Sequence, residues 1–169
     1  MMKLLGSVLI AGAAAWLGLT ASLQLRRRVR ALDEIAASLL LLEQELELSA
    51  PDLEQLALRV SRSSRGAGRV LFERFGASLK YLGERTTGQL WERAVEGLEA
   101  VSPEGKRRLV SLGECLGRFD DREQRACVSA VRARLEQLRE QEERDCRTRC
   151  RTCHALCLSG GAFLVILLI

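Results

Sequence analysis

The chain has 169 residues, of which 47% are apolar and 28% charged, and its formal net charge is +4. All Asp and Glu, and every Lys and Arg except Lys3, lie between residues 26 and 153, so two apolar ends flank a charged middle. This partition excludes an ordinary soluble enzyme, a disordered tail and a collagen-like repeat. Aromatic residues, at 4%, are too scarce for stacking on bases, and we expect no nucleic-acid partner.

Residues 4–25 form an uncharged apolar run that is long enough to cross a hydrocarbon core about 30 Å thick. A signal peptide carries its positive charge ahead of the apolar run, whereas here four arginines between Arg26 and Arg30 follow it. We therefore predict an uncleaved transmembrane helix over residues 1–25 with its arginine-rich end in the cytoplasm. One helix face carries small residues that permit close packing in lipid, although such residues are also common in membrane helices: Ser7, Ala11, Ala15, Gly18 and Ser22.

Residues 26–154 are predicted to form one cytoplasmic domain, and its first three helices follow from apolar spacing. Apolar residues at three- and four-residue steps give a seam across residues 27–48. Ser49 as a cap and Pro51 in a first turn predict a second helix that runs to about Arg62. A third helix is predicted over residues 67–84, with this buried side: Val70, Leu71, Phe72, Phe75, Leu79 and Leu82.

Three further helices complete the predicted domain. Thr87 can cap a fourth helix that contains Trp91, and Ser102-Pro103 opens a fifth. After a break at residues 117–120, a long final helix contains no Pro or Gly before Ser159. The fold class is therefore all-α, an antiparallel six-helix bundle flanked by two transmembrane helices, with Phe72, Phe75 and Trp91 in its core.

The break before the final helix combines four residues with separate structural roles. Gly117 is expected just past the fifth helix, where a left-handed conformation favours glycine, and Asp120 is expected to cap the sixth. Gly113 would allow a close approach to a neighbouring helix, and Gln124 would hold the turn down. The rival interpretation is that this cluster, at the end of the bundle, is a docking site for a partner protein.

Residues 155–169 form the second apolar end. Fifteen residues span only about 23 Å as a helix, so this is a short membrane span, and a helix tail packed in the core is the alternative. The arginines between Arg144 and Arg151 place its start in the cytoplasm, so the chain is a hairpin with both termini outside. Gly160 and Gly161 form a second small-residue patch that could meet the first.

Four cysteines precede and enter this segment with spacings of four, three and four: Cys146, Cys150, Cys153 and Cys157. On one helix the outer two sulfurs lie about 16 Å apart, so a single zinc ion cannot bind all four. We interpret the stripe as small apolar seam residues and keep a metal site as the alternative. All six cysteines are expected to be thiols in a reducing cytoplasm. His154 has no acid or base partner, and we expect no catalytic residue and no cofactor.

Several motifs resemble the stage III sporulation protein AB family over the whole chain. The residues that carry the resemblance are Lys3–Ile10, Leu42-Glu-x-Glu45, Leu71-Phe72-x-x-Phe75, Trp91, Leu112-Gly113-x-x-Leu116-Gly117-x-x-Asp120-x-x-x-Gln124 and the apolar C-terminus from Gly161. One departure is Ala50-Pro51-Asp52-Leu53, where the family commonly has Thr-Pro-Leu. The four-cysteine stripe is not typical of the family.

The resemblance implies a non-enzymatic platform protein, similar to the cytoplasmic helical domain of type II secretion F and pilus platform proteins. It implies a place in the mother-cell membrane of an endospore-forming bacterium during engulfment, in a channel complex that joins the mother cell to the forespore. The implied partners are a cytoplasmic ATPase like stage III sporulation protein AA, other membrane channel subunits and the lipid bilayer, and association with a second copy of the chain is left open. The alternative is a membrane-anchored thiol or metal sensor that uses the four-cysteine stripe, which would require exposed, reactive thiols.

Overall fold

The computed structural model describes residues 2–48, 52–116 and 121–168, with side chains described at residues 20, 22–47, 52–116, 122–148 and 152. These residues form six α-helices and no strand, which confirms the predicted all-α class and the number of helices. The helices are α1 (Met2–Leu48), α2 (Leu53–Ser63), α3 (Gly66–Ser78), α4 (Thr87–Glu96), α5 (Pro103–Val110) and α6 (Asp121–Leu168). Two short 3₁₀ helices, η1 (Leu79–Tyr81) and η2 (Ser111–Glu114), follow α3 and α5.

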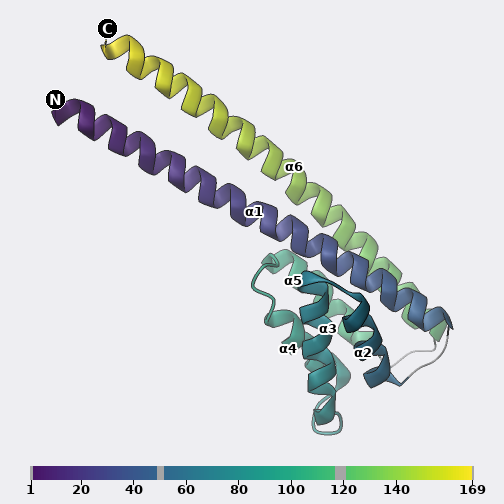
Figure 1. Ribbon diagram of the computed structural model, residues 1–169. Coiled ribbons are helices and arrows are strands. Elements are labelled where there is room, and N and C mark those ends of the chain that lie inside the picture. Colours follow the sequence, from purple (N-terminus) through teal and green to yellow (C-terminus); the bar gives the residue numbers. More distant parts are fainter. Residues whose placement is uncertain (1, 49–51, 117–120, 169) are drawn as a thin grey trace. The chain divides into compact units, whose positions relative to one another are not determined.

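The chain divides into two compact units. Residues 1–27 and 141–169 form one, and residues 28–140 form the other, which we call the bundle unit. The bundle unit gathers the short helices α2 to α5 with residues 28–48 of α1 and residues 121–140 of α6 (Figure 1). Over the residues described above, no helix combines the length and the apolarity needed to cross a membrane, so both predicted spans stay predictions.

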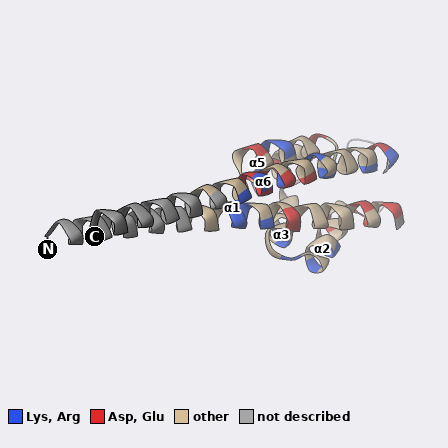
Figure 2. Ribbon diagram, turned by 90° about the horizontal axis from the view of Figure 1, so that it is seen from above, with Lys and Arg blue, Asp and Glu red and all other residues tan. Residues whose placement is uncertain are grey.

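The core of the bundle unit contains the seam predicted on α1. Its five large apolar residues are all buried: Leu32, Ile35, Leu39, Leu42 and Leu46. They share one side of α1 because helical side chains three and four residues apart point the same way. Leucine and valine residues from α2, α3, α4, α5 and α6 complete a single hydrophobic cluster around them. Acidic and basic residues both lie along the helices of this unit (Figure 2).

Two predicted helix starts differ from the observed ones. The fourth helix is capped by Thr86 and not by Thr87: the Gln89 N–H donates to Thr86 Oγ1, and the Thr86 N–H donates to Gln89 Oε1. Only Thr86 stands three residues before a glutamine, which this reciprocal pair of hydrogen bonds requires. α2 begins at Leu53 with Asp52 in the cap position, while Ser49 and Pro51 lie outside the described residues.

The third helix is shorter than predicted, and two of its expected core residues are exposed. α3 ends at Ser78, and the chain passes through η1 into a turn at Gly83, whose φ is +116°. Leu82 therefore lies in a loop and is 54% exposed. Val70 is 39% exposed because the buried side of α3 is centred on Leu71, Phe72 and Phe75. Burial of Val70 and Leu82 was thus a wrong prediction.

α3 is held against α1 by a contact that the sequence analysis missed. The Ala67 N–H donates to Glu34 Oε2 (2.8 Å), so a carboxylate from α1 caps a helix 33 residues later. Gly66 has a φ of +51°, which favours glycine. A Cβ at Gly68 would lie 2.6 Å from the Glu34 backbone oxygen and 2.8 Å from the Ser38 side chain. The missing side chain at Gly68 therefore permits the close approach of the two helices.

Two cysteines of the bundle unit form a disulfide, which corrects the expectation that all six are thiols. Cys115 follows η2, Cys127 lies in α6, and their Cα atoms are 6.4 Å apart. The bridge joins the end of the α5–η2 segment to α6 across a sequence separation of 12. The expectation of thiols rested on the inferred compartment, and redox environment says nothing about which side chains a fold brings together.

Candidate functional site

The three aromatic residues predicted for the core lie together, at the junction of α3, α4 and α5. Trp91 is fully buried, and the Phe72 and Phe75 rings meet it edge-on at centroid distances of 5.7 Å and 5.1 Å. The indole N–H of Trp91 donates to the Leu109 backbone oxygen (2.7 Å), which links α4 to α5. This hydrogen bond fixes the orientation of the large and otherwise apolar indole ring.

Gly113 lies against this aromatic cluster. A Cβ at Gly113 would lie 3.0 Å from Trp91 Cδ1 and 3.2 Å from the Gly88 Cα. The glycine therefore allows η2 to approach α4 closely. Of the other residues in the predicted structural motif, Gln124 is buried, while Gly117 and Asp120 lie outside the described residues. Both interpretations of that break, a helix cap and a docking site, stay predictions.

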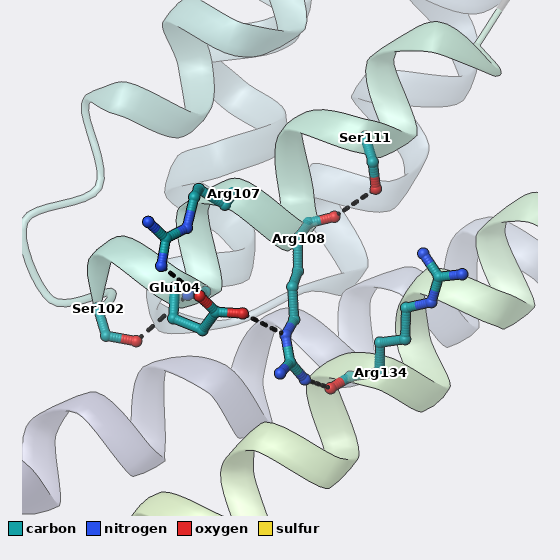
Figure 3. Close-up of polar contacts among 7 residues, drawn as sticks. Ser102, Glu104, Arg107, Arg108, Ser111 and Arg134 are labelled. Carbon is teal, nitrogen blue, oxygen red and sulfur yellow. Dashed lines mark hydrogen bonds and ion pairs between the residues drawn. The ribbon is translucent and has the colours of Figure 1, made fainter.

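A polar cluster joins α5 to α6, and Figure 3 shows its side chains. Ser102 caps α5 by accepting the Gly105 N–H (3.3 Å), as Pro103 occupies the first turn. Glu104 pairs with Arg107 and with Arg108, whose Nε donates to Oε1 (3.0 Å). The guanidinium of Arg108 also donates from Nη1 to the Arg134 backbone oxygen in α6 (2.6 Å).

The contacts of this cluster stabilise the packing of α5 against α6. Hydrogen bonds from Arg107 and then Arg108 lower the pKa of the Glu104 carboxyl, so the carboxylate stays ionised near neutral pH. A general acid or base needs a pKa close to the working pH, and this carboxylate is shifted the other way. Arg108 therefore acts as a tie between two helices. The Glu–Arg spacing of four was visible in the sequence, but its second contact, to α6, was not.

Ion pairs connect α1 to α6 inside the bundle unit. Arg132 Nε lies 3.0 Å from Glu43 Oε2, and Arg132 Nη1 lies 2.7 Å from Glu136 Oε1. Arg139 and Asp33 form a longer pair at 3.7 Å. Because one partner of the first pair is 89 residues from the other, no local sequence pattern could reveal it.

The predicted cysteine stripe is described at one position only. Cys146 is buried, while the side chains of Cys150, Cys153 and Cys157 lie outside the described residues. Among the side chains that are described, no three His, Cys, Asp or Glu are grouped to hold a metal ion. A thiol sensor needs an accessible thiolate, and the burial of Cys146 does not favour that role.

The predicted membrane-packing residues fall mostly where side chains are not described. Ser22 is half-buried in α1. The side chains of the remaining positions lie outside the described residues: Ser7, Ala11, Ala15, Gly18, Gly160 and Gly161. Their proposed packing in lipid stays a prediction.

Comparison with known proteins gives one structural match and one family match. A solved structure of a stage III sporulation protein AB superposes with a TM-score of 0.62 at 21% identity, over 72% of this chain and 97% of that one. This likeness concerns the fold. A search of curated proteins finds no match. The family model of stage III sporulation protein AB matches residues 3–169, which include both apolar ends and the whole bundle unit, and the chain therefore belongs to the stage III sporulation protein AB family.

Proposed function

We propose that the protein is a non-enzymatic platform of the sporulation channel complex between mother cell and forespore, and that its bundle unit docks a cytoplasmic ATPase. The observation that carries the proposal is the family match over residues 3–169. A second support is the character of the bundle unit, whose described core is built from apolar residues and whose buried polar contacts tie helices together. Such a unit is suited to present a rigid, charged surface to a partner.

Membrane anchoring is part of this proposal. It rests on the uncharged runs at residues 4–25 and 155–169 and on the arginines that adjoin each run on the side of the bundle unit. The bundle unit then lies in the mother-cell cytoplasm and both termini lie outside it. A topology map with reporters fused at each terminus and inserted at the exposed loop residue Gly83 tests this arrangement. A reporter at Gly83 that is active outside the cytoplasm contradicts it.

ATPase docking has a separate test. The full-length chain in detergent is mixed with the purified stage III ATPase, and retention on an affinity column is measured. The chain is scanned by reversing one exposed arginine on each of α3, α4 and α6: Arg69, Arg93 and Arg134. We expect retention by the unaltered chain and loss of retention in a subset of these variants that maps to one face. Thermal unfolding of each variant shows whether it remains folded. If the unaltered chain does not retain the ATPase, the docking proposal is wrong.

A further inference from the structure

α2 carries an exposed stripe whose charges are opposite at its two ends. Glu54, Leu58 and Arg62 recur every four residues, so they share one face of the helix, and all three are exposed. Leu58, at the centre, is 50% exposed. The opposite side of α2 is buried through Leu56, Ala57, Val60 and Ser61. We call Glu54, Leu58 and Arg62 the α2 stripe.

Within the described chain, no side chain of the bundle unit pairs with the two charged residues of this stripe. Glu54 and Arg62 form no ion pair or side-chain hydrogen bond within the described chain, whereas neighbouring Arg59 pairs with Glu45 of α1 at 3.2 Å. An acidic residue in the first turn and a basic one in the last turn suit the helix dipole. That effect accounts for the signs of the two charges, and the half-exposed Leu58 between them gives the stripe an apolar centre.

We propose that the α2 stripe docks against the α2 stripe of a second copy of this chain, with the two helices antiparallel about a two-fold axis at Leu58. In this arrangement Leu58 meets Leu58, and Glu54 of each copy meets Arg62 of the other. The interface is self-complementary, as a two-fold interface must be. A parallel arrangement would instead place like charges opposite each other, so the charges select the antiparallel one.

The size of α2 sets the strength of the contact. Its 11 residues extend over about 16 Å, so one helix pair buries less than the roughly 1,000 Å² expected of a stable interface. The dimer is therefore weak and concentration-dependent, and it weakens further as salt screens its exposed charges. This contact is independent of ATPase docking, which can fail while the dimer forms.

Photo-crosslinking of the full-length chain in detergent tests the contact. The photoreactive amino acid p-benzoylphenylalanine replaces Leu58, and a matched control carries it at Leu82, which is similarly exposed at 54% but lies in the loop after η1. We expect a covalent dimer from position 58 that increases with protein concentration, decreases with salt, and maps by mass spectrometry to α2 of the second copy. Equal crosslinking from position 82, a crosslink that maps outside α2, or no dimer overturns the proposal.

Charge-reversal variants test the antiparallel pairing directly. Glu54→Arg alone and Arg62→Glu alone each place like charges opposite one another, and each is expected to lower the crosslinked fraction about tenfold. The double variant restores opposite charges and is expected to recover the dimer, as is a mixture of the two single variants. Circular dichroism verifies that each variant is folded. Failure of both the double variant and the mixture to recover the dimer overturns the antiparallel pairing.

Discussion

Replacing Trp91 is the most direct test of how the bundle unit is stabilised. The Trp91 side chain is fully buried, and its two edge-on ring contacts and its hydrogen bond to the Leu109 oxygen join α3, α4 and α5. Burying roughly 200 Å² of a tryptophan side chain is worth about 5 kcal/mol. Trp→Ala substitutions in cores cost about 3–5 kcal/mol, and the lost hydrogen bond adds about 1 kcal/mol. We expect Trp91→Ala to lower the free energy of unfolding by about 5 kcal/mol.

A loss of that size is comparable to the whole stability of a small domain, which is about 5–15 kcal/mol. Trp91→Phe is therefore the informative companion, because it keeps a ring in the core and removes the indole N–H. The lost hydrogen bond and the small cavity together predict a loss of about 2 kcal/mol.

Chemical denaturation followed by far-ultraviolet circular dichroism measures both variants without using tryptophan fluorescence as the probe. A change below about 0.5 kcal/mol in Trp91→Ala would refute the reasoning, because that is the range of surface substitutions. Equal losses in the alanine and phenylalanine variants would show that the hydrogen bond, and not the buried ring, carries the effect.

Three further predictions follow from contacts within the bundle unit. Reducing the Cys115–Cys127 bridge, or replacing both cysteines with serine, is expected to lower stability by about 3 kcal/mol in scanning calorimetry, from the loop of roughly 13 residues that it closes; an unchanged melting temperature contradicts this. Gly68→Ala is expected to destabilise by about 1–3 kcal/mol because its Cβ would press on the α1 backbone, whereas the control Gly76→Ala, with its nearest contact at 3.5 Å, is expected to be neutral or stabilising by up to about 1 kcal/mol. In a carbon-detected NMR titration, the pKa of the Glu104 carboxyl is expected to be lower than that of an ordinary glutamate. Its ion pairs with Arg107 and Arg108 therefore contribute fully above the unfolded-state pKa of about 4.3 and are lost as the pH falls through the lower folded-state pKa. Arg108→Ala is expected to bring the pKa of Glu104 back toward its usual value. An unshifted pKa of Glu104 in the parent chain would contradict the pairing.

Local sequence patterns predicted the helical elements well. The seam from Leu32 to Leu46 is buried throughout, because helical periodicity alone decides which side chains share a face. Ser102 and Pro103 open α5 as expected, since a cap and a first-turn proline act within a few residues. A long helix after the break was expected because no Pro or Gly occurs before Gly160, and α6 runs from Asp121 to Leu168.

The contacts between helices, including those of the candidate site, were predicted less well, because they join residues far apart in the chain. Glu34 caps α3 from a distance of 33 residues, and Arg132 reaches Glu43 across 89. Neither contact can be recognised in the sequence, because a glutamate or arginine on a helix surface occurs at the same spacing whether or not it has a distant partner. Gly68 is similar: only the position of α1 shows why a side chain there would clash.

The all-helical class, the buried face of α1, the two apolar ends and the family could all be read from the chain, because each depends on residue type and short-range spacing. The packing of distant elements was needed to show that Val70 and Leu82 are exposed, that Thr86 caps α4 through its reciprocal hydrogen bonds with Gln89, and that Cys115 meets Cys127. Burial and covalent pairing depend on which elements pack against a residue. That information is distributed over the whole chain, and no window of neighbouring residues contains it.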